Sequence, residues 1–366
     1  MYMFQLGKIY TLQIFIVYMD KYVFEFSQDN VGSLKNANVK PISKTEKSTF
    51  FMQNRHGYNI QFSPSNADIF AVATCQFFGR EGGGTLFLLQ LNQKGTIDEI
   101  EKIDWTDGLF DIAWAKHNPN ILISACGDGT VQLWDVDSKS MSLVSGYSKP
   151  KSCYSEHGSE VCCVDWSSQD SLFLSGSWDC SIKLWNPNYK MSLKTYNGHR
   201  KLVYESKFGK KNSNIFMSAS ADGYLKIWDI LQPYPISTIL AHNNSEVLCC
   251  DWNEFDQNIV ATGGSDNNIR LWDLRFVASP VIELHGCEYA IRRVRFSPFN
   301  SSVLASVSYD HTSRIWNWQY DDEAMEIITH HKESNYGLDW NRLVPNQLGD
   351  CGWDSVVNVY TPASLT

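Results

Sequence analysis

The stretch SGSWDCSIKLW, residues 175–185, decides the fold of this chain. Asp179 follows Ser175 by four residues, and six residues after the Asp an apolar strand pattern ends on Trp185. The spacing from Asp to aromatic residue recurs unchanged, with its Asp at Asp128, Asp179, Asp222, Asp266, Asp310 and Asp354. Self-similarity at a fixed period is the signature of repeat architectures, so the repeat is counted before any local prediction.

Two aromatic markers count the repeats. The first closes an apolar strand pattern at intervals of 52, 52, 42, 44, 44 and 44 residues: Phe62, Trp114, Trp166, Phe208, Trp252, Phe296 and Trp340. The second stands near the end of a later strand pattern, and in the first and last repeats other residues replace the Trp: Leu89, Trp134, Trp185, Trp228, Trp272, Trp316 and Tyr360. Each marker occurs seven times, and about 44 residues suit four short strands with tight turns. The sequence therefore predicts an all-β fold, a single seven-bladed β-propeller.

The residues around each turn Asp predict a repeated polar network. Four residues before each Asp stands Ser124, Ser175, Ser218, Thr262, Ser306 or, in the last repeat, Asp350. A His lies 18 to 20 residues upstream in three repeats: His157, His199 and His242. This combination resembles the WD-repeat tetrad, in which the turn Asp accepts amide and imidazole N–H groups and the hydroxyl and indole complete the network. In the sixth repeat Gly286-Cys287 replaces the expected Gly-His pair and His285 is displaced, so no complete tetrad is assigned there.

Sets of His, Ser and Asp also invite a hydrolase interpretation. A nucleophile, its base and an orienting acid are needed once, beside an oxyanion hole, whereas these sets recur in several repeats. The sequence also lacks a GxSxG nucleophile elbow. We therefore expect a binding protein and no enzyme, with no catalytic residues, no cofactor and no metal, and we assign the six turn Asp residues a structural role.

The chain ends predict how the ring closes. Only six residues follow Tyr360, too few for an outer strand, so we expect the apolar stretch from Ser48 to Gln53 to supply it. This divides the chain into residues 1–47, an extension expected to be poorly ordered or to add a strand, and residues 48–366, the propeller. The apolar run Ile9 to Met19 is too short to span a bilayer. The first repeat lacks the tetrad, and a longer, more mobile turn is expected at Phe77-Phe78 and Gly82 to Gly84.

Composition narrows the class of partner. With 43% hydrophobic and 13% aromatic residues the chain can build a large core, and a net charge of −9 disfavours binding to nucleic acid phosphates. The ten cysteines show no disulfide framework and no CxxC pair, which indicates a reducing compartment. A basic protein partner is the better match.

One mouth of the propeller channel is the candidate binding face. Residues near the start of each inner strand, together with residues that precede a turn Asp, are expected to surround it. We refer to this set as the rim: Tyr58, Phe110, Glu160, Trp178, Tyr204, Glu246, Arg292, Tyr309, Tyr336 and Trp353. Large aromatics are frequent anchors of protein interfaces, and the acids would attract a cationic partner. The pattern suits a peptide that is apolar on one side and cationic on the other.

Four stretches carry a more specific resemblance: RHGYNIQFSP (55–64), DGLFDIAW (107–114), SGSWDCSIKLW (175–185) and YAIRRVRFSPF (289–299). They resemble the peroxin-7 family, the WD-repeat receptors for the type 2 peroxisomal targeting signal (PTS2), from about Arg55 to the end of the chain. The resemblance implies a receptor that cycles from the cytoplasm to the peroxisome membrane and matrix and does not itself insert into a membrane. It also implies two partners. One is the cargo, such as a peroxisomal thiolase, whose N-terminal amphipathic helix bears an Arg, apolar residues and a His or Gln. The other is a co-receptor peroxin, either long-form peroxin-5 or a fungal-type equivalent.

A second function class stays open. Trp272-Asp273-Leu274-Arg275 matches the WDxR box by which some propellers dock to cullin-type ubiquitin ligases, with Arg275 as the contact. Four residues within a common repeat form a weak signal, and a strand end with a surface Arg explains them better. We therefore carry the substrate adaptor as the alternative function.

Overall fold

A computed structural model describes residues 47–136, 143–144 and 147–366 of the chain. Ile42–Thr366 form one compact unit by themselves. Apart from Lys47, the predicted N-terminal extension lies outside the described residues, and so does its apolar run.

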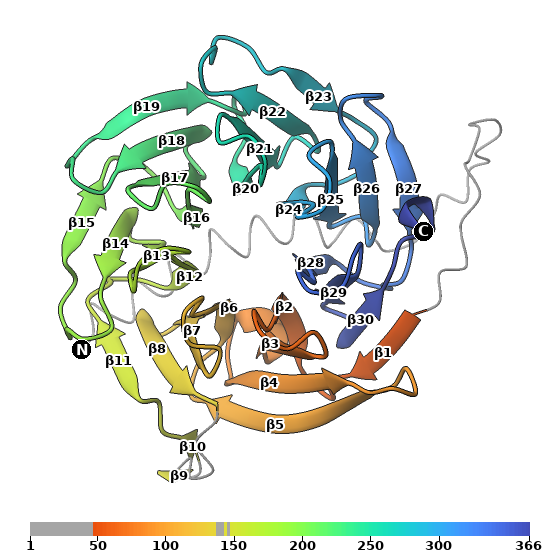
Figure 1. Cartoon of the computed structure of the whole chain (residues 1–366). Helices are drawn as coiled ribbons and strands as arrows, with labels where there is room; N and C mark the ends of the chain where they lie inside the picture. The colour runs from red at the N-terminus through yellow and green to blue at the C-terminus, as the bar shows by residue number, and fades with distance from the viewer. Residues whose placement is uncertain (1–46, 137–142, 145–146) are drawn as a thin grey trace. The chain divides into compact units, whose positions relative to one another are not determined.

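The compact unit contains seven four-stranded antiparallel sheets arranged as blades around a ring (Figure 1). Blade 1 comprises β2 (His56–Phe62), β3 (Ile69–Cys75), β4 (Gly84–Leu91) and β5 (Ile97–Trp105). Blade 2 comprises β6 (Leu109–Trp114), β7 (Ile121–Cys126), β8 (Thr130–Asp135) and β11 (Ser152–Ser155), with a small hairpin of β9 (Leu143–Val144) and β10 (Tyr147–Ser148) between its last two strands. Blade 3 comprises β12 (Val161–Trp166), β13 (Phe173–Ser177), β14 (Ser181–Trp185) and β15 (Lys194–Asn197). Blade 4 comprises β16 (Val203–Phe208), β17 (Ile215–Ser220), β18 (Tyr224–Asp229) and β19 (Pro235–Leu240).

The remaining blades follow the same order from the channel outward. Blade 5 comprises β20 (Val247–Trp252), β21 (Ile259–Gly264), β22 (Ile269–Asp273) and β23 (Ile282–Leu284). Blade 6 comprises β24 (Ile291–Phe296), β25 (Val303–Ser308), β26 (Ser313–Asn317) and β27 (Ala324–Ile328). Blade 7 comprises β28 (Asn335–Trp340), β29 (Leu348–Gly352), β30 (Val356–Tyr360) and β1 (Lys47–Phe51). The described residues also form two short 3₁₀ turns, η2 (Phe77–Gly79) and η3 (Ala363–Leu365).

The ring closes through β1, as the short C-terminal end predicted. This N-terminal strand pairs antiparallel with β30, from Lys47 opposite Tyr360 to Phe51 opposite Val356. The observed strand begins one residue before the predicted stretch and ends two residues before its end. Closure leaves the sheet ring without a gap between its first and last repeats, which is how propellers avoid a long exposed edge.

The hydrophobic core is divided among the contacts between neighbouring blades. One cluster joins Ile123 and Val131 of blade 2 to Val164 and Trp166 of blade 3, and another joins Phe62 and Phe70 of blade 1 to Val357 of blade 7. A single sheet therefore cannot bury its own apolar face, and each blade needs its neighbour. The first aromatic marker ends each inner strand, as the repeat predicted, and Trp166 and Phe62 lie in these clusters between blades.

Acidic side chains tie each inner strand to the next blade. In five of the described inner strands a carboxylate accepts a backbone N–H from the following inner strand at 2.8–3.0 Å. Asp111 accepts from Val164, Asp165 from Phe208, Glu205 from Cys250, Asp251 from Phe296 and Asp339 from Phe62. These bonds satisfy buried amides that have no partner within their own sheet.

Blade 6 carries cations in the channel instead. Arg295 and Arg293 lie 2.7 Å and 3.4 Å from Glu205 of blade 4, and Arg293 lies 3.6 Å from Asp111 of blade 2. Burial raises the pKa of Glu205, but Arg295, Arg293 and Lys207 outweigh this effect and lower the pKa to about 2. The middle of the channel therefore holds paired charges from blades 2, 4 and 6.

Candidate functional site

A β-bulge at the same place in every inner strand builds one mouth of the channel. In β2, the pairing with the second strand of the blade skips the third residue. In each of the other six inner strands, it skips the second residue. The residues skipped by the ladder are Tyr58, Phe110, Cys162, Tyr204, Leu248, Arg292 and Tyr336. A bulge adds an unpaired residue and re-aims its side chain, so each blade directs one side chain to the mouth.

The bulges show that the rim residues near the strand starts occupy two kinds of position. Tyr58, Phe110, Tyr204, Arg292 and Tyr336 are bulge residues, whereas Glu160 and Glu246 precede the first residue of their strands. In blades 3 and 5 the bulge residues are Cys162 and Leu248, which sequence reasoning missed. Counting four residues back from every first marker would have found both.

The structure brings five rim aromatics together on blades 1, 2, 6 and 7, and we call this group the aromatic half of the rim: Tyr58, Phe110, Tyr309, Tyr336 and Trp353. Tyr58 is central, with ring centroids 4.6 Å from Tyr336, 5.3 Å from Phe110 and 6.0 Å from Trp353. Tyr336 stacks on Trp353 at 5.4 Å, and Tyr309 lies 5.8 Å from Tyr336. These contacts hold the rings together, with Tyr58, Tyr336 and Trp353 buried and with Phe110 and Tyr309 partly exposed.

Arg292 belongs to this aromatic half. Its guanidinium carbon lies 4.3 Å from the centroid of the Tyr336 ring, which is the geometry of a cation–π contact. The side chain is buried. It therefore packs as part of the aromatic wall.

The other four rim residues lie on blades 3, 4 and 5, and we call them the acidic half of the rim: Glu160, Trp178, Tyr204 and Glu246. The Tyr204 hydroxyl donates a hydrogen bond of 2.8 Å to Glu246. Burial, with a smaller contribution from Glu246, raises the pKa of Tyr204 well above 10, so its proton stays in place to orient the carboxylate. Glu160 accepts the hydroxyl of Ser159, and its backbone oxygen accepts the N–H of Trp178 at 2.9 Å. The mouth is thus apolar on one side and acidic on the other.

The turn Asp residues of blades 3 to 5 form the network that the repeats suggested. His157 lies 2.8 Å from Asp179 and 2.7 Å from the Ser175 hydroxyl, which also accepts the Trp185 indole N–H at 2.8 Å. His199 in blade 4 and His242 in blade 5 make the same pair of contacts, to Asp222 and Ser218 and to Asp266 and Thr262. Each set links the start of its blade to the turn between its second and third strands. Its polar groups are engaged in these hydrogen bonds, whereas a catalytic triad would need them free to react.

The other three tetrad positions are variations on this network. In blade 2, Trp105 donates its indole N–H to Asp128 at 3.2 Å, and it stands 19 residues before Ser124, where the other blades have His. In blade 6, where no complete tetrad was assigned, Arg314 lies 3.1 Å from Asp310 and His285 contacts Asn268 instead.

Blade 7 has a histidine that sequence reasoning missed. His331 lies 3.0 Å from Asp350 and 2.9 Å from Asp354, and the Tyr360 hydroxyl donates to Asp350 at 2.8 Å. The spacing of 19 residues between His331 and Asp350 equals that between His199 and Ser218, so the signal was present. It was overlooked because an acid replaces the Ser.

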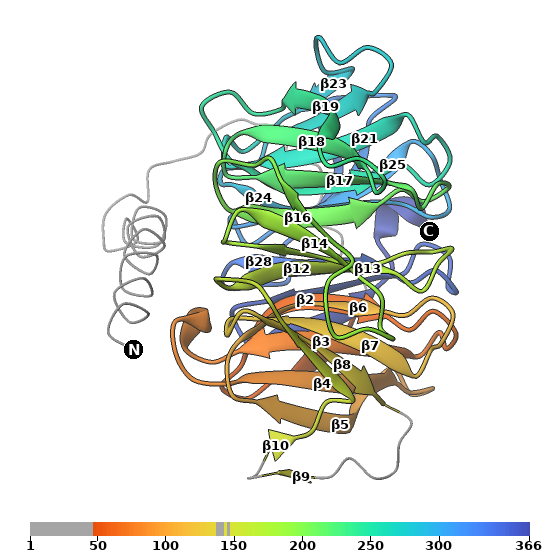
Figure 2. The ribbon, with the colours of Figure 1, turned by 90° about the vertical axis from the view of Figure 1, so that its left-hand side faces the viewer.

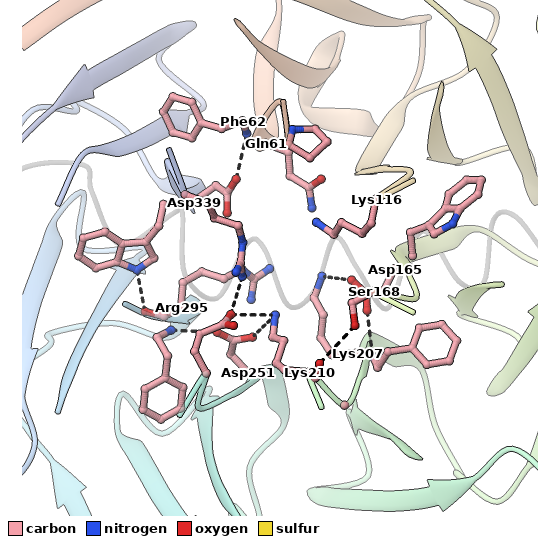
Figure 3. Close-up of a pocket in the computed structure, with 18 of the residues that line it drawn as sticks. Gln61, Phe62, Lys116, Asp165, Ser168, Lys207, Lys210, Asp251, Arg295 and Asp339 are labelled. Atoms are coloured by element: carbon pink, nitrogen blue, oxygen red, sulfur yellow. Dashed lines mark hydrogen bonds and ion pairs between the residues drawn. The ribbon is translucent and has the colours of Figure 1, made fainter. Parts of the chain in front are cut away.

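The opposite mouth of the channel holds a cavity of about 360 Å³ (Figure 3). It is lined by residues from the ends of the inner strands, and its charges are largely paired. Lys207 lies 3.1 Å from Asp165, and Lys210 lies 3.4 Å from Glu254. None of the rim residues lines this cavity, so the candidate binding face and the cavity are separate features.

Residues 47–136, 143–144 and 147–366 offer neither a metal cluster nor a membrane-spanning helix. No three His, Cys, Asp or Glu side chains of these residues are grouped closely enough to hold a metal ion. No helix among them has the length and apolar character required to cross a membrane.

The seven closed sheets and the repeated Trp–Ser–His–Asp contacts define a WD-repeat propeller. The family model described as WD domain, G-beta repeat matches residues 102–135, 148–186, 190–229, 233–273 and 278–317. Similarity to curated proteins is more specific. The chain is 41% identical over 320 residues to the peroxisomal targeting signal 2 receptor of Mus musculus, covering 87% of this chain and 98% of the relative. It is 42% identical over 314 residues to the receptor of Homo sapiens (85% and 94% covered) and 32% identical over 378 residues to that of Saccharomyces cerevisiae (85% and 98% covered).

The chain belongs to the family of peroxisomal targeting signal 2 receptors, the peroxin-7 family. This membership confirms the resemblance found in the sequence and places the protein in peroxisomal import. It also agrees with the expectation of a binding protein and not an enzyme.

Proposed function

We propose that the rim binds the type 2 signal of peroxisomal cargo as an amphipathic helix. The observation that carries the proposal is the division of the mouth into an aromatic half on blades 1, 2, 6 and 7 and an acidic half on blades 3, 4 and 5. Helix-in-groove recognition uses anchors at positions i, i+3, i+4 and i+7, which lie on one helix face. A helix with an apolar stripe and a neighbouring Arg matches both halves at once.

The acidic half supplies the charge recognition. Glu246 is held by the Tyr204 hydroxyl, so its carboxylate has little freedom to lose when a guanidinium binds. Glu160, on blade 3, is the second carboxylate of this half. A hydrogen bond between the cargo Arg and one of these acids contributes about 1.5–3 kcal/mol.

The aromatic half supplies apolar area. Tyr and Trp side chains offer large surfaces with few rotatable bonds, so ordering them on binding costs little entropy. The stacked Tyr336 and Trp353 rings are already fixed by Tyr58 and Arg292. A co-receptor peroxin covers the exposed side of the bound helix in this proposal, and the receptor carries its cargo from the cytoplasm to the peroxisome membrane and matrix.

The direct experiment is a titration of the purified chain with a labelled type 2 signal peptide, with and without a candidate co-receptor. A second peptide, with its Arg replaced by Met, serves as the matched control. We expect binding that weakens by about tenfold or more without the Arg, the equivalent of one charge-assisted hydrogen bond. Equal affinity for the two peptides, or no binding under either condition, would contradict the proposal.

The ubiquitin-ligase adaptor gains no support from the geometry of its motif. The guanidinium of Arg275 forms hydrogen bonds of 2.6 Å and 2.8 Å with the Asp273 carboxylate two residues earlier. Such a local ion pair is an ordinary surface feature. The receptor function therefore remains the one proposed.

A further inference from the structure

The turn η2 is a strained segment at the edge of the mouth. It occupies the place where the other blades have their tetrad turn, between the second and third strands of blade 1. Phe77 and Phe78 both adopt left-handed backbone, with φ of 44° and 58°. Bulky residues rarely take this conformation, and it persists only where the surroundings enforce it.

Contacts with the aromatic half of the rim enforce the turn. The Phe78 ring stacks on His56 at 3.9 Å and meets Trp353 edge-on at 5.3 Å. The Phe78 carbonyl oxygen accepts the Tyr58 hydroxyl at 2.8 Å. One of the two strained phenylalanines is therefore a built-in part of the wall formed by Tyr58 and Trp353.

Gly79 shows how closely the turn lies on the rim. A Cβ atom at this position would stand 2.8 Å from the Phe110 ring and 2.9 Å from the Tyr58 hydroxyl oxygen, closer than side-chain carbons come. Gly79 also has a positive φ of 70°. Only glycine satisfies both conditions, so the backbone of η2 rests directly on two rim residues.

The neighbouring Phe77 side chain is held out of this packing. It is 58% exposed, although Phe77 and Phe78 both have left-handed backbone. Single exposed apolar residues are common on protein surfaces and need no explanation alone. Phe77 differs because the strained turn that carries it is held against the rim by Phe78 and Gly79. In Figure 2 the turn is the short orange coil that stands out at the ends of β3 and β4.

We propose that Phe77 is an apolar anchor of the receptor, which packs against the apolar face of the cargo signal helix. The inference rests on the proposed function and adds a specific residue to it. A cationic amphipathic helix is the fitting occupant because the turn that carries Phe77 rests on the aromatic half, while Glu160 and Glu246 belong to the acidic half of the same mouth. The strain of the turn serves to present the ring before cargo arrives, so that less ordering is needed on binding.

The test uses Phe77→Asn, because Asn tolerates left-handed backbone better than Phe does. Removal of the ring is expected to weaken binding of the signal peptide about tenfold, as loss of a buried aromatic contact requires. The melting temperature is expected to stay the same or to rise, since backbone strain is relieved. A purely structural residue would lower stability and affinity together.

Phe276→Asn is the matched control. Phe276 is 76% exposed and follows β22, on the side of blade 5 opposite the mouth, and its replacement is expected to leave the affinity unchanged. Phe77→Leu keeps an apolar side chain on the same strained backbone and is expected to retain most of the binding.

The outcomes separate the inference from the proposed function. If the wild-type chain binds the peptide in an Arg-dependent manner and Phe77→Asn binds equally well, the anchor is wrong and the receptor function stands. If Phe77→Leu binds as weakly as Phe77→Asn, apolar anchoring is also refuted. If the wild-type chain fails to bind the peptide at all, both the proposed receptor function and the Phe77 anchor are refuted.

Discussion

The imidazole of His331 lies between two carboxylates in blade 7, and this sets it apart from the tetrad histidines of blades 4 and 5. Burial lowers its pKa, but Asp350 and Asp354 outweigh burial and raise the pKa to about 9. For His199, burial prevails over Asp222 and the pKa is lowered. Asp350, where the other blades have Ser or Thr, thus favours a protonated imidazole over a neutral one.

This difference predicts opposite responses to pH. A folded pKa above the unfolded value of about 6.5 gives stability that is complete below that value and is lost as pH rises through about 9. The free energy of unfolding lost in His331→Gln should therefore be smaller at pH 9.5 than at pH 6. His199→Gln, measured by the same urea titrations, should show no such decline. Parallel behaviour of the two variants would disprove a charged His331.

Single residues also mark the limit of sequence reasoning about the networks. Asp179, Ser175 and His157 could be predicted as a set because residue type and spacing both repeat. Trp105 and His331 occupy equivalent places, but one differs in residue type and the other has an unusual partner. The physical requirement is an N–H donor at that position, which an indole meets as well as an imidazole.

At the scale of the element, the turn after each tetrad Asp has a uniform backbone. The residue that follows the Asp has φ between 66° and 85° in all six turns: Gly129, Cys180, Gly223, Asn267, His311 and Ser355. The left-handed region favours glycine, and four of the six residues carry a side chain there. The turn geometry is therefore imposed by the carboxylate, which accepts the amide two residues later, as Asp179 does from Ser181 at 2.9 Å.

Cys180→Gly should stabilise the protein. Relief of the left-handed strain, less the extra entropy of glycine in the unfolded chain, leaves a gain of about 0.5–1 kcal/mol. The reverse change is the control: Gly223→Ala should cost about 1–2 kcal/mol, because a Cβ would stand 3.0 Å from the His242 carbonyl oxygen at a φ of 85°. Thermal melts measure both. A destabilised Cys180→Gly would show that the thiol packs usefully where it lies.

Strands were predictable and bulges were not. The period-2 pattern and the aromatic markers place the ends of the inner strands, since burial between blades demands an apolar residue there. A bulge re-aims the side chain of its extra residue, and in blades 3 and 5 that residue is Cys162 or Leu248, two positions after the Glu160 and Glu246 that were proposed. Hydrophobicity alone carries no sign of this extra residue.

At the scale of the whole molecule, β1 joins the two ends of the chain into one ring. The Phe50 ring packs edge-on against Phe87 of blade 1 at 6.2 Å and joins the cluster between blades 7 and 1. Phe50→Ala should therefore cost about 2–3 kcal/mol of unfolding free energy, toward the low end of the cost of large-to-small core substitutions because the ring is only partly buried. Phe51 points to the other face of the strand and is 63% exposed, so Phe51→Ala should change little. Equal effects of the two changes, measured by urea titration, would mean that closure through β1 does not support the ring.

The order of the blades determines what could be foreseen about the site. The repeat predicts which positions surround the mouth, and their residue types predict an aromatic and acidic rim. The separation into halves arises because the aromatic residues belong to blades that are neighbours only after the ring has closed, as Tyr336 of blade 7 and Tyr58 of blade 1 are. The anchor Phe77 depends on left-handed backbone that no hydrophobic pattern encodes.

The measurement that tests the central claim most directly is a double-mutant cycle between Glu246→Gln and a signal peptide with its Arg replaced by Met. Titration of both receptors with both peptides gives the coupling free energy between the two side chains. If the acidic half of the rim binds the cargo Arg, the two changes are expected to be non-additive by about 1.5 kcal/mol or more, and the second change should add little once the first is made. Additivity within about 0.5 kcal/mol would show that Glu246 and the Arg act independently, and it would contradict recognition of the signal by this mouth.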